Sequence, residues 1–336
     1  MKKNSRYAIH SDFDKFPVIN FRFNRPVIGM INAALAFDCW RTQRQRLRAA
    51  PCHAINSAPG VSFNCFEFRP ASTDAGSALP AVLYYHGGAY AMSYASSHVA
   101  AAQRYADAAN CAVFLVDYRL VPAARYPAAI DDSYAALDWV MTNATKLGVD
   151  PDRVVVAGDS AGGGLAAAAA QRYLDDNGTQ LAGQLLIYPT LDSRCSTPSA
   201  TDFVDTPMWN AVSNRRMWHA YIGDAALTNP PPYASPAHRE DLSGLPSTYM
   251  ETAEFDPLVD EGKEYAARLQ QAGVEVVVNH TRGTVHGFDA VLSSAIVQAA
   301  YASPEAHARL ISGVTVELRG GRTMRGSPIG RSLTGP

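Results

Sequence analysis

The chain has 336 residues, of which 47% are apolar, and 29 basic side chains nearly balance 31 acidic ones. This length fits one large α/β domain or two modest ones, and the apolar content suffices for a sizeable core. Because the charges almost cancel, we expect neither a nucleic acid nor an anionic membrane surface as a partner.

The five cysteines are scattered along the chain, odd in number and without a Cys-x-x-Cys pair. This usage predicts reduced thiols in a reducing compartment, hence a cytoplasmic protein, and no zinc site. No apolar run reaches the roughly 18 residues that a membrane span requires. Basic residues follow Met1, but acidic side chains precede any apolar run, so we expect no signal peptide.

From residue 61 onward, short apolar strands alternate with longer helical stretches. Within residues 1–50, the apolar run 27–37 predicts an amphipathic helix, and no strand pattern occurs before 61. Strands are predicted at 61–68, 81–85, 112–116, 153–157, 185–188, 247–251 and 274–279. Helices are predicted at 97–109, 127–143, 165–170 and 258–271, with further helices up to about 318. This alternation indicates βα units and a mostly parallel sheet.

The segment 190–240 interrupts the alternation. It is rich in Pro, Asp, Ser and Thr and carries bulky side chains, Trp209 and Trp218 among them. A long irregular insertion in an α/β fold is typical of a lid or a substrate pocket. Both tryptophans fit a pocket wall and a local core equally well.

Between the strand at 153–157 and the following helix stands the pattern Gly158-x-Ser160-x-Gly162. A strand that turns at once into a helix places the turning residue in a strained conformation, and side chains on its neighbours would collide. The serine hydroxyl then sits at the tip of the turn, over the positive end of the helix. A plain Gly-rich connection or a phosphate loop is the alternative, but no Gly-x-Gly-x-x-Gly and no Gly-Lys-Ser/Thr occurs here.

Three polar residues follow predicted strands in the order Ser160, Asp256, His286. The carboxyl ends of parallel strands share one edge of a sheet, so these side chains are expected to meet there. An imidazole can take the proton of a serine hydroxyl, and a carboxylate then fixes the imidazole tautomer. We therefore predict a nucleophile, an acid and a base in that order. Nearby carboxylates that compete with Asp256 are Glu254, Asp260 and Glu261, of which the last two fit the first turn of a helix without any catalytic role.

A second glycine-rich loop, His86-Gly87-Gly88-Ala89, follows the strand at 81–85. Backbone N–H groups of Gly87 and Gly88, together with that of Ala161, are predicted to form an oxyanion hole. We expect His86 to hold this loop and not to act as a second base. We expect Asp159, beside the nucleophile, to point away from the substrate and to have a supporting role. No His/Cys/Asp cluster has metal-ligand spacing, so no metal site is predicted.

Several motifs in register resemble the hormone-sensitive-lipase branch of the α/β-hydrolase esterases over about residues 80–290. They are His86-Gly87-Gly88, Asp117-Tyr118-Arg119-Leu120, Tyr126-Pro127-Ala128-Ala129, Gly158-Asp159-Ser160-Ala161-Gly162-Gly163, Asp256-Pro257-Leu258 and His286-Gly287-Phe288. The resemblance implies an α/β-hydrolase fold, with a mostly parallel eight-stranded sheet flanked by helices and a helical cap. It also implies hydrolysis of carboxylic esters, often with short acyl chains, by Ser160, His286 and Asp256 without a cofactor.

The resemblance and the composition of the chain's last residues together suggest a division of the chain. We expect an N-terminal cap segment at 1–50, a catalytic domain at 51–318 with its cap insertion at 190–240, and a disordered Gly/Arg/Ser-rich tail at 319–336. The family often has a third glycine where this chain has Ala89, which argues against esters of bulky or tertiary alcohols. A small ester is the expected partner, and a homodimer is one possible assembly.

Two other functions use the same fold. An amide-directed hydrolase, such as an arylformamidase or a deacetylase, has the same machinery, and the sequence does not separate it from an esterase. A non-catalytic ligand receptor is the third candidate, but such proteins lose the serine or the histidine, and this chain keeps both.

Overall fold

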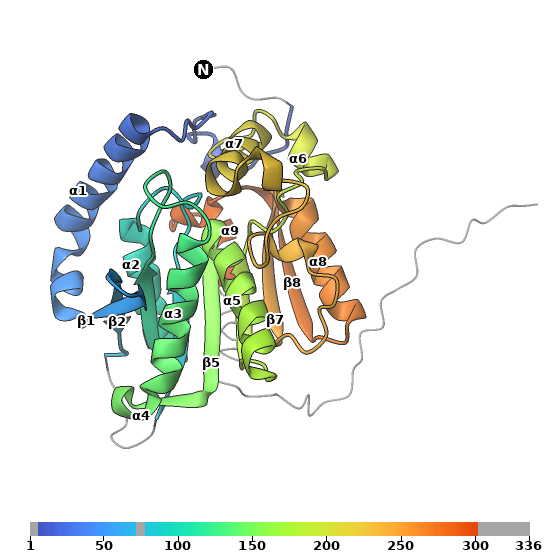
Figure 1. The fold of residues 1–336 in the computed structure, drawn as a ribbon. Helices are drawn as coiled ribbons and strands as arrows, with labels where there is room; N and C mark the ends of the chain where they lie inside the picture. The colour runs from blue at the N-terminus through green and yellow to red at the C-terminus, as the bar shows by residue number, and fades with distance from the viewer. Residues whose placement is uncertain (1–5, 72–77, 302–336) are drawn as a thin grey trace, which may run out of the picture.

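The computed structural model describes residues 6–71 and 78–301 of the chain. In these residues eight strands form one sheet in the order β1-β2-β4-β3-β5-β6-β7-β8, with helices on both faces (Figure 1). The pairs β1–β2 and β2–β4 are antiparallel, and every other pair is parallel. The predicted α/β fold with a mostly parallel eight-stranded sheet is therefore confirmed.

The element bounds lie close to those expected for most of the chain. The strands are β1 (Cys52–Ala58), β2 (Val61–Phe68), β3 (Leu79–Tyr85), β4 (Ala112–Asp117), β5 (Val149–Asp159), β6 (Gly183–Ile187), β7 (Thr248–Phe255) and β8 (Val276–Val285). The helices are α1 (Arg25–Ala49), α2 (Ser96–Ala109), α3 (Ala128–Thr142), α4 (Ala144–Leu147), α5 (Ala161–Asn177), α6 (Pro198–Asp202), α7 (Ala211–Ile222), α8 (Val259–Gln271) and α9 (Ala295–Tyr301).

The central strands separate two cores. In β3, Leu83 and Tyr85 pack on the side of α3, α5 and α8, whereas Val82 and Tyr84 pack on the side of α2 and α9. All residues of β3 are buried. A strand that is covered on both faces must be apolar throughout, which explains why its sequence lacks polar alternation.

We expected no strand before residue 61, and this expectation is wrong. Residues Cys52–Ala58 form β1, which pairs with β2 at one edge of the sheet. Only Ile55 of this strand is buried. An edge strand with so little covered surface needs no apolar alternation, so its sequence carries no strand pattern.

The helix predicted at 27–37 is present as the longer α1, but it is not amphipathic. The Asn24 side chain accepts a hydrogen bond from the N–H of Val27 and so caps its first turn. Met30, Phe37 and Trp40 are exposed, and few side chains of the helix are buried. The helix packs mainly on α2, and Ile28 and Cys39 are its buried side chains.

Residues 7–24, which we call the N-terminal strap, lie beside the 190–240 segment above the carboxyl ends of the strands (Figure 1). Hydrogen bonds join the two segments: Met208 N–H to Pro17 O (2.9 Å), Asn210 Nδ2 to Ile19 O (3.0 Å) and Phe21 N–H to Ser213 Oγ (3.0 Å). Two parts of the chain that are almost 200 residues apart thus cover the same end of the sheet.

Among the helices of the described residues, none combines the length and the apolar character that crossing a bilayer requires. Of the helices expected up to about 318, α9 (Ala295–Tyr301) is present, and the remainder of that region and the tail at 319–336 lie outside the described residues.

Candidate active site

Ser160 stands at the sharp turn between β5 and α5. Its backbone has φ +55° and ψ −121°, a region that side chains rarely adopt. Its N–H donates to Ile187 O (2.8 Å), and its carbonyl accepts from Thr190 N–H (3.0 Å) and Gly164 N–H (3.1 Å). These bonds on both sides hold the strained turn in place, with the side chain 8% exposed.

Glycine is required at two positions of this turn, because other backbone atoms lie where a Cβ atom would stand. A Cβ atom on Gly158 would collide with the carbonyl of Gly162, and one on Gly162 would collide with the carbonyl of Tyr85. The collision partners are backbone atoms of β3 and of the turn itself, which cannot move independently. The predicted reason for glycine on both sides of Ser160 therefore matches the geometry.

Replacing Gly162 with Ala is expected to destabilise the protein by about 1–3 kcal/mol, because backbone must shift to admit the methyl group. Gly29→Ala is the matched control, since a Cβ atom there meets nothing within 4 Å and Gly29 lies inside α1. That control should be neutral or slightly stabilising. Chemical denaturation of both variants measures the difference, and equal stabilities would contradict the packing argument.

The three predicted residues meet at the carboxyl end of the sheet. His286 follows β8 directly, and its Nε2 atom lies 2.8 Å from Ser160 Oγ. Its Nδ1 atom lies 2.7 Å from Oδ2 of Asp256, which follows β7 and is fully buried. The other oxygen of Asp256 accepts from Leu258 N–H at 3.0 Å. A carboxylate only accepts hydrogen bonds, so Nδ1 carries the imidazole proton and Nε2 accepts from the serine hydroxyl.

The competing carboxylates point elsewhere. Glu254 accepts from Gly283 N–H at 2.6 Å, and Asp260 accepts from Ser199 N–H at 2.8 Å. Glu261 accepts from Leu191 N–H at 2.7 Å. Asp260 and Glu261 do lie in the first turn of α8, as expected, but both bind backbone of the 190–240 segment. Sequence reasoning missed these contacts, because nothing in the spacing of the residues indicates them.

The loop after β3 presents N–H groups toward the same end of the sheet, but not those we expected. Gly87 N–H donates to Asp159 Oδ1 at 3.1 Å, so it is not free for a substrate oxygen. Within residues 6–71 and 78–301, the N–H groups of Gly88, Ala89 and Ala161 have no hydrogen-bond acceptor. Gly88 and Ala89 have φ values of +122° and +57°, which turn this stretch of backbone back on itself.

A buried network fixes this loop from below. Asp159 also accepts from Tyr84 OH at 2.9 Å and lies 3.3 Å from His98 Nε2. Burial alone would raise the pKa of Asp159, but the charge and hydrogen bond of His98 and the hydroxyl of Tyr84 hold it below its ordinary value. The sequence indicated a supporting role for Asp159, but no pattern in the sequence indicated that His98 contacts it.

His86 is fully buried. Its Nδ1 atom donates to the carbonyl of Gly87 at 2.7 Å, and its ring stacks on Tyr118 with centroids 4.4 Å apart. Burial lowers the pKa of His86 to about 3, so the ring is neutral at ordinary pH. The expectation that His86 holds the loop agrees with these contacts.

Aromatic side chains surround the imidazole of His286. Tyr188 lies edge-on at 4.8 Å, and Trp209 lies tilted over the ring at 5.9 Å. Phe21 of the N-terminal strap packs on Trp209 at 5.8 Å. Of the two tryptophans considered above, Trp209 thus borders the site, while Trp218 is buried against Tyr90 and Tyr221.

The described part of the chain contains no group of three or more His, Cys, Asp or Glu side chains arranged to hold a metal ion.

Comparisons of the chain and its fold with known proteins identify related proteins. Residues 82–290 match the family described as alpha/beta hydrolase fold. The chain is 38% identical to "Esterase LipI" of Mycobacterium tuberculosis over 73% of this chain and 80% of that protein. It is 43% identical to "Carboxylesterase NlhH" of the same species, over 62% of this chain and 66% of that protein. The solved structure of esterase LipW from Mycobacterium marinum, 30% identical, superposes with a TM-score of 0.81 over 91% of this chain and 96% of that one.

Proposed function

Because the chain belongs to the α/β-hydrolase family, in its hormone-sensitive-lipase-like branch, and is a carboxylic-ester hydrolase, we propose that it cleaves short-acyl esters through a Ser160–His286–Asp256 triad. The observation that carries this proposal is the unbroken series of hydrogen bonds from Asp256 Oδ2 through His286 to Ser160 Oγ, at 2.7 Å and 2.8 Å. Its three members come from three different strand ends.

In the proposed reaction, Ser160 Oγ attacks the ester carbonyl carbon while His286 Nε2 takes the hydroxyl proton. The tetrahedral intermediate collapses, the C–O bond to the alcohol breaks, and His286 returns the proton to the departing oxygen. Water then attacks the acyl carbon while His286 takes its proton. The bond from that carbon to Ser160 Oγ breaks, His286 returns the proton to Oγ, and the carboxylic acid leaves. Asp256 keeps the Nδ1 proton in place and stabilises the imidazolium that forms in both halves of the reaction.

The negative oxygen of the intermediate needs donors that are free and aimed at one point. We assign this task to the N–H groups of Gly88, Ala89 and Ala161, since that of Gly87 is bound to Asp159. The earlier expectation that Gly87 contributes a donor is thus replaced. Ala161 is the first residue of α5, so its N–H also carries the positive end of the helix dipole.

The size of the acyl site follows from the aromatic side chains beside the imidazole. Trp209 and Tyr188 border His286, and the N-terminal strap closes over Trp209 through Phe21. We propose that the N-terminal cap segment 1–50 and the insertion 190–240 together act as the cap over a catalytic domain. Bulky walls so near the reacting atoms leave room for short acyl chains.

A series of nitrophenyl esters with acyl chains of increasing length tests both the size of the acyl site and the class of reaction. We expect kcat/KM to be highest for short acyl chains and to fall as the chain lengthens, because longer chains meet the aromatic walls. The anilide that matches the preferred ester should react more slowly. A maximum at the dodecanoyl ester would contradict the proposed size, and faster cleavage of the anilide would favour an amide-directed hydrolase.

A further inference from the structure

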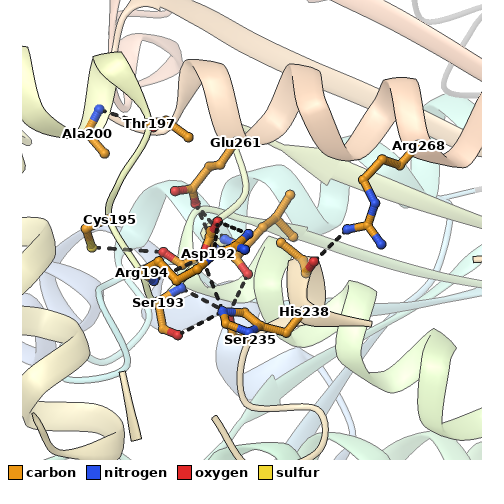
Figure 2. Close-up of polar contacts among 12 residues, drawn as sticks. Asp192, Ser193, Arg194, Cys195, Thr197, Ala200, Ser235, His238, Glu261 and Arg268 are labelled. Atoms are coloured by element: carbon orange, nitrogen blue, oxygen red, sulfur yellow. Dashed lines mark hydrogen bonds and ion pairs between the residues drawn. The ribbon is translucent and has the colours of Figure 1, made fainter. Parts of the chain in front are cut away.

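Glu261 lies in the first turn of α8 and is 2% exposed, although it forms no ion pair with a basic side chain of residues 6–71 and 78–301. Its Oε1 atom accepts from the N–H of Leu191 at 2.7 Å and from that of Asp192 at 3.3 Å (Figure 2). Its Oε2 atom is buried without a hydrogen-bond partner among the described residues. Burying a carboxyl group costs free energy unless hydrogen bonds or a charged partner compensate for it, so the contacts of Glu261 point to a role.

The backbone that Glu261 binds lies against the serine turn. Thr190, the residue before Leu191, donates its N–H to the carbonyl of Ser160 at 3.0 Å. On the same stretch, a Cβ atom on Gly163 would meet Pro189 at 2.8 Å, so this backbone touches α5 closely. Whatever fixes the position of Leu191 therefore also fixes the position of Ser160.

The other side of Glu261 leads to the triad acid. Glu261 is five residues beyond Asp256, and Asp256 itself accepts from Leu258 N–H at the start of α8. The first turn of this helix thus holds Asp256 at one end and the backbone of 191–192 at the other. This is a short and mostly buried connection between the acid and the nucleophile that does not pass through His286.

The surroundings decide the charge of Glu261. Asp192 binds Arg194 at 2.6 Å and lies 3.3 Å from His238 (Figure 2). Burial alone would raise the pKa of Asp192, but the hydrogen bonds from Arg194 hold it below its ordinary value. Burial raises the pKa of Glu261 well above its ordinary range, and the charge of Asp192 adds to this effect. These shifts favour the protonated form of Glu261 and the ionised form of Asp192.

Ser235 holds the same backbone from the opposite side. Its hydroxyl donates to Leu191 O at 2.8 Å and accepts from Ser193 N–H at 3.0 Å. Leu191 is thus bound through both its N–H and its carbonyl, and Glu261 supplies the bond that comes from the helix beside the triad acid.

We propose that Glu261 is a positioning residue for the ester hydrolysis proposed above: through Oε1 it holds the 190–192 backbone and thereby sets Ser160 relative to Asp256 and His286. The inference rests on the proposed function. The proposed role requires the acceptor atom Oε1 and not a negative charge. Gln at this position should therefore preserve the role, while a side chain of similar size without an acceptor should not.

The test compares Glu261→Gln and Glu261→Met with the wild type and with Glu264→Met, an exposed position one turn further along α8. Turnover is expressed per active site, titrated with an organophosphate that labels Ser160, so that loss of folded protein does not count as loss of rate. We expect Glu261→Gln to turn over like the wild type. Glu261→Met should lose at least about tenfold in kcat per titrated site with little change in KM, because the serine is misplaced. Glu264→Met should be unaffected.

The outcomes separate the two proposals. A wild-type enzyme that is inactive on esters, or is labelled at another residue, contradicts the proposed function itself. An active wild type with unchanged kcat per site in Glu261→Met overturns the positioning role, as does a Glu261→Gln variant that is as slow as Glu261→Met. If Glu261→Met does not fold, Glu261→Asp withdraws the acceptor by one methylene and carries the same expectation of a slower kcat per site.

Discussion

Ser160→Ala is expected to lower the turnover of esters by about 10⁶-fold, the loss typical of removing a serine nucleophile. The side chain is 8% exposed and its hydroxyl bonds only to His286 Nε2 among the described residues, so no other contact is lost. Far-UV circular dichroism and thermal unfolding should match the wild type. Turnover is followed with the best nitrophenyl ester of the series described above.

Ser133→Ala is the matched control for this prediction. Ser133 is also buried, but its hydroxyl donates to Ala129 O within α3, away from the site. This variant should keep the wild-type rate. An organophosphate should attach to Ser160 alone in the wild type and should not attach in Ser160→Ala. An adduct mapped to any other residue would show that the nucleophile is misassigned.

Asp256→Asn is expected to lower kcat by about 10⁴-fold while the fold survives. The amide has nearly the shape of the carboxyl group, and its oxygen can still accept from Leu258 N–H. Its NH₂ group then faces His286 Nδ1, where Oδ2 now lies at 2.7 Å. The imidazole must then adopt the tautomer that carries its proton on Nε2. In that tautomer Nε2 can no longer accept the proton of Ser160.

Glu254→Gln and Asp260→Asn are the controls, because an amide oxygen can still accept from Gly283 N–H and Ser199 N–H respectively. Both should retain most of the turnover. If Asp256→Asn keeps more than about a tenth of the activity and Glu254→Gln does not, the acid of the triad is Glu254 and not Asp256.

The sequence is informative where local geometry leaves a single choice of residue. The all-apolar strand β3 is buried on both faces, and Gly158 and Gly162 stand where a Cβ atom would collide with backbone. These features follow from steric exclusion, which acts on the residues themselves. The order of Ser160, Asp256 and His286 along a parallel sheet then predicts their meeting at one edge, and the structure places them within hydrogen-bond distance.

Features that depend on distant partners were not predictable. β1 has little covered surface and therefore no pattern, and α1 exposes Trp40 because few of its side chains are buried. Gly87 has the right residue type for an oxyanion donor, yet its N–H is taken by Asp159, 72 residues away. For Glu261, the helix dipole accounts for a carboxylate in a first turn, but it does not reveal the backbone of 191–192 that this side chain binds.

The N-terminal strap has a consequence for the order in which the protein folds. Tyr7 OH bonds to Asp205 at 2.7 Å, and His10 N–H donates to Gly283 O at 2.9 Å. Phe13, fully buried, packs against Phe288 with ring centroids 6.4 Å apart. The strap precedes these partners in the chain by almost 200 residues or more, so it is synthesised well before them. Its aromatic side chains therefore stay uncovered until residues 205–288 have been made, and a chaperone that binds the strap on the nascent chain would protect them during that interval.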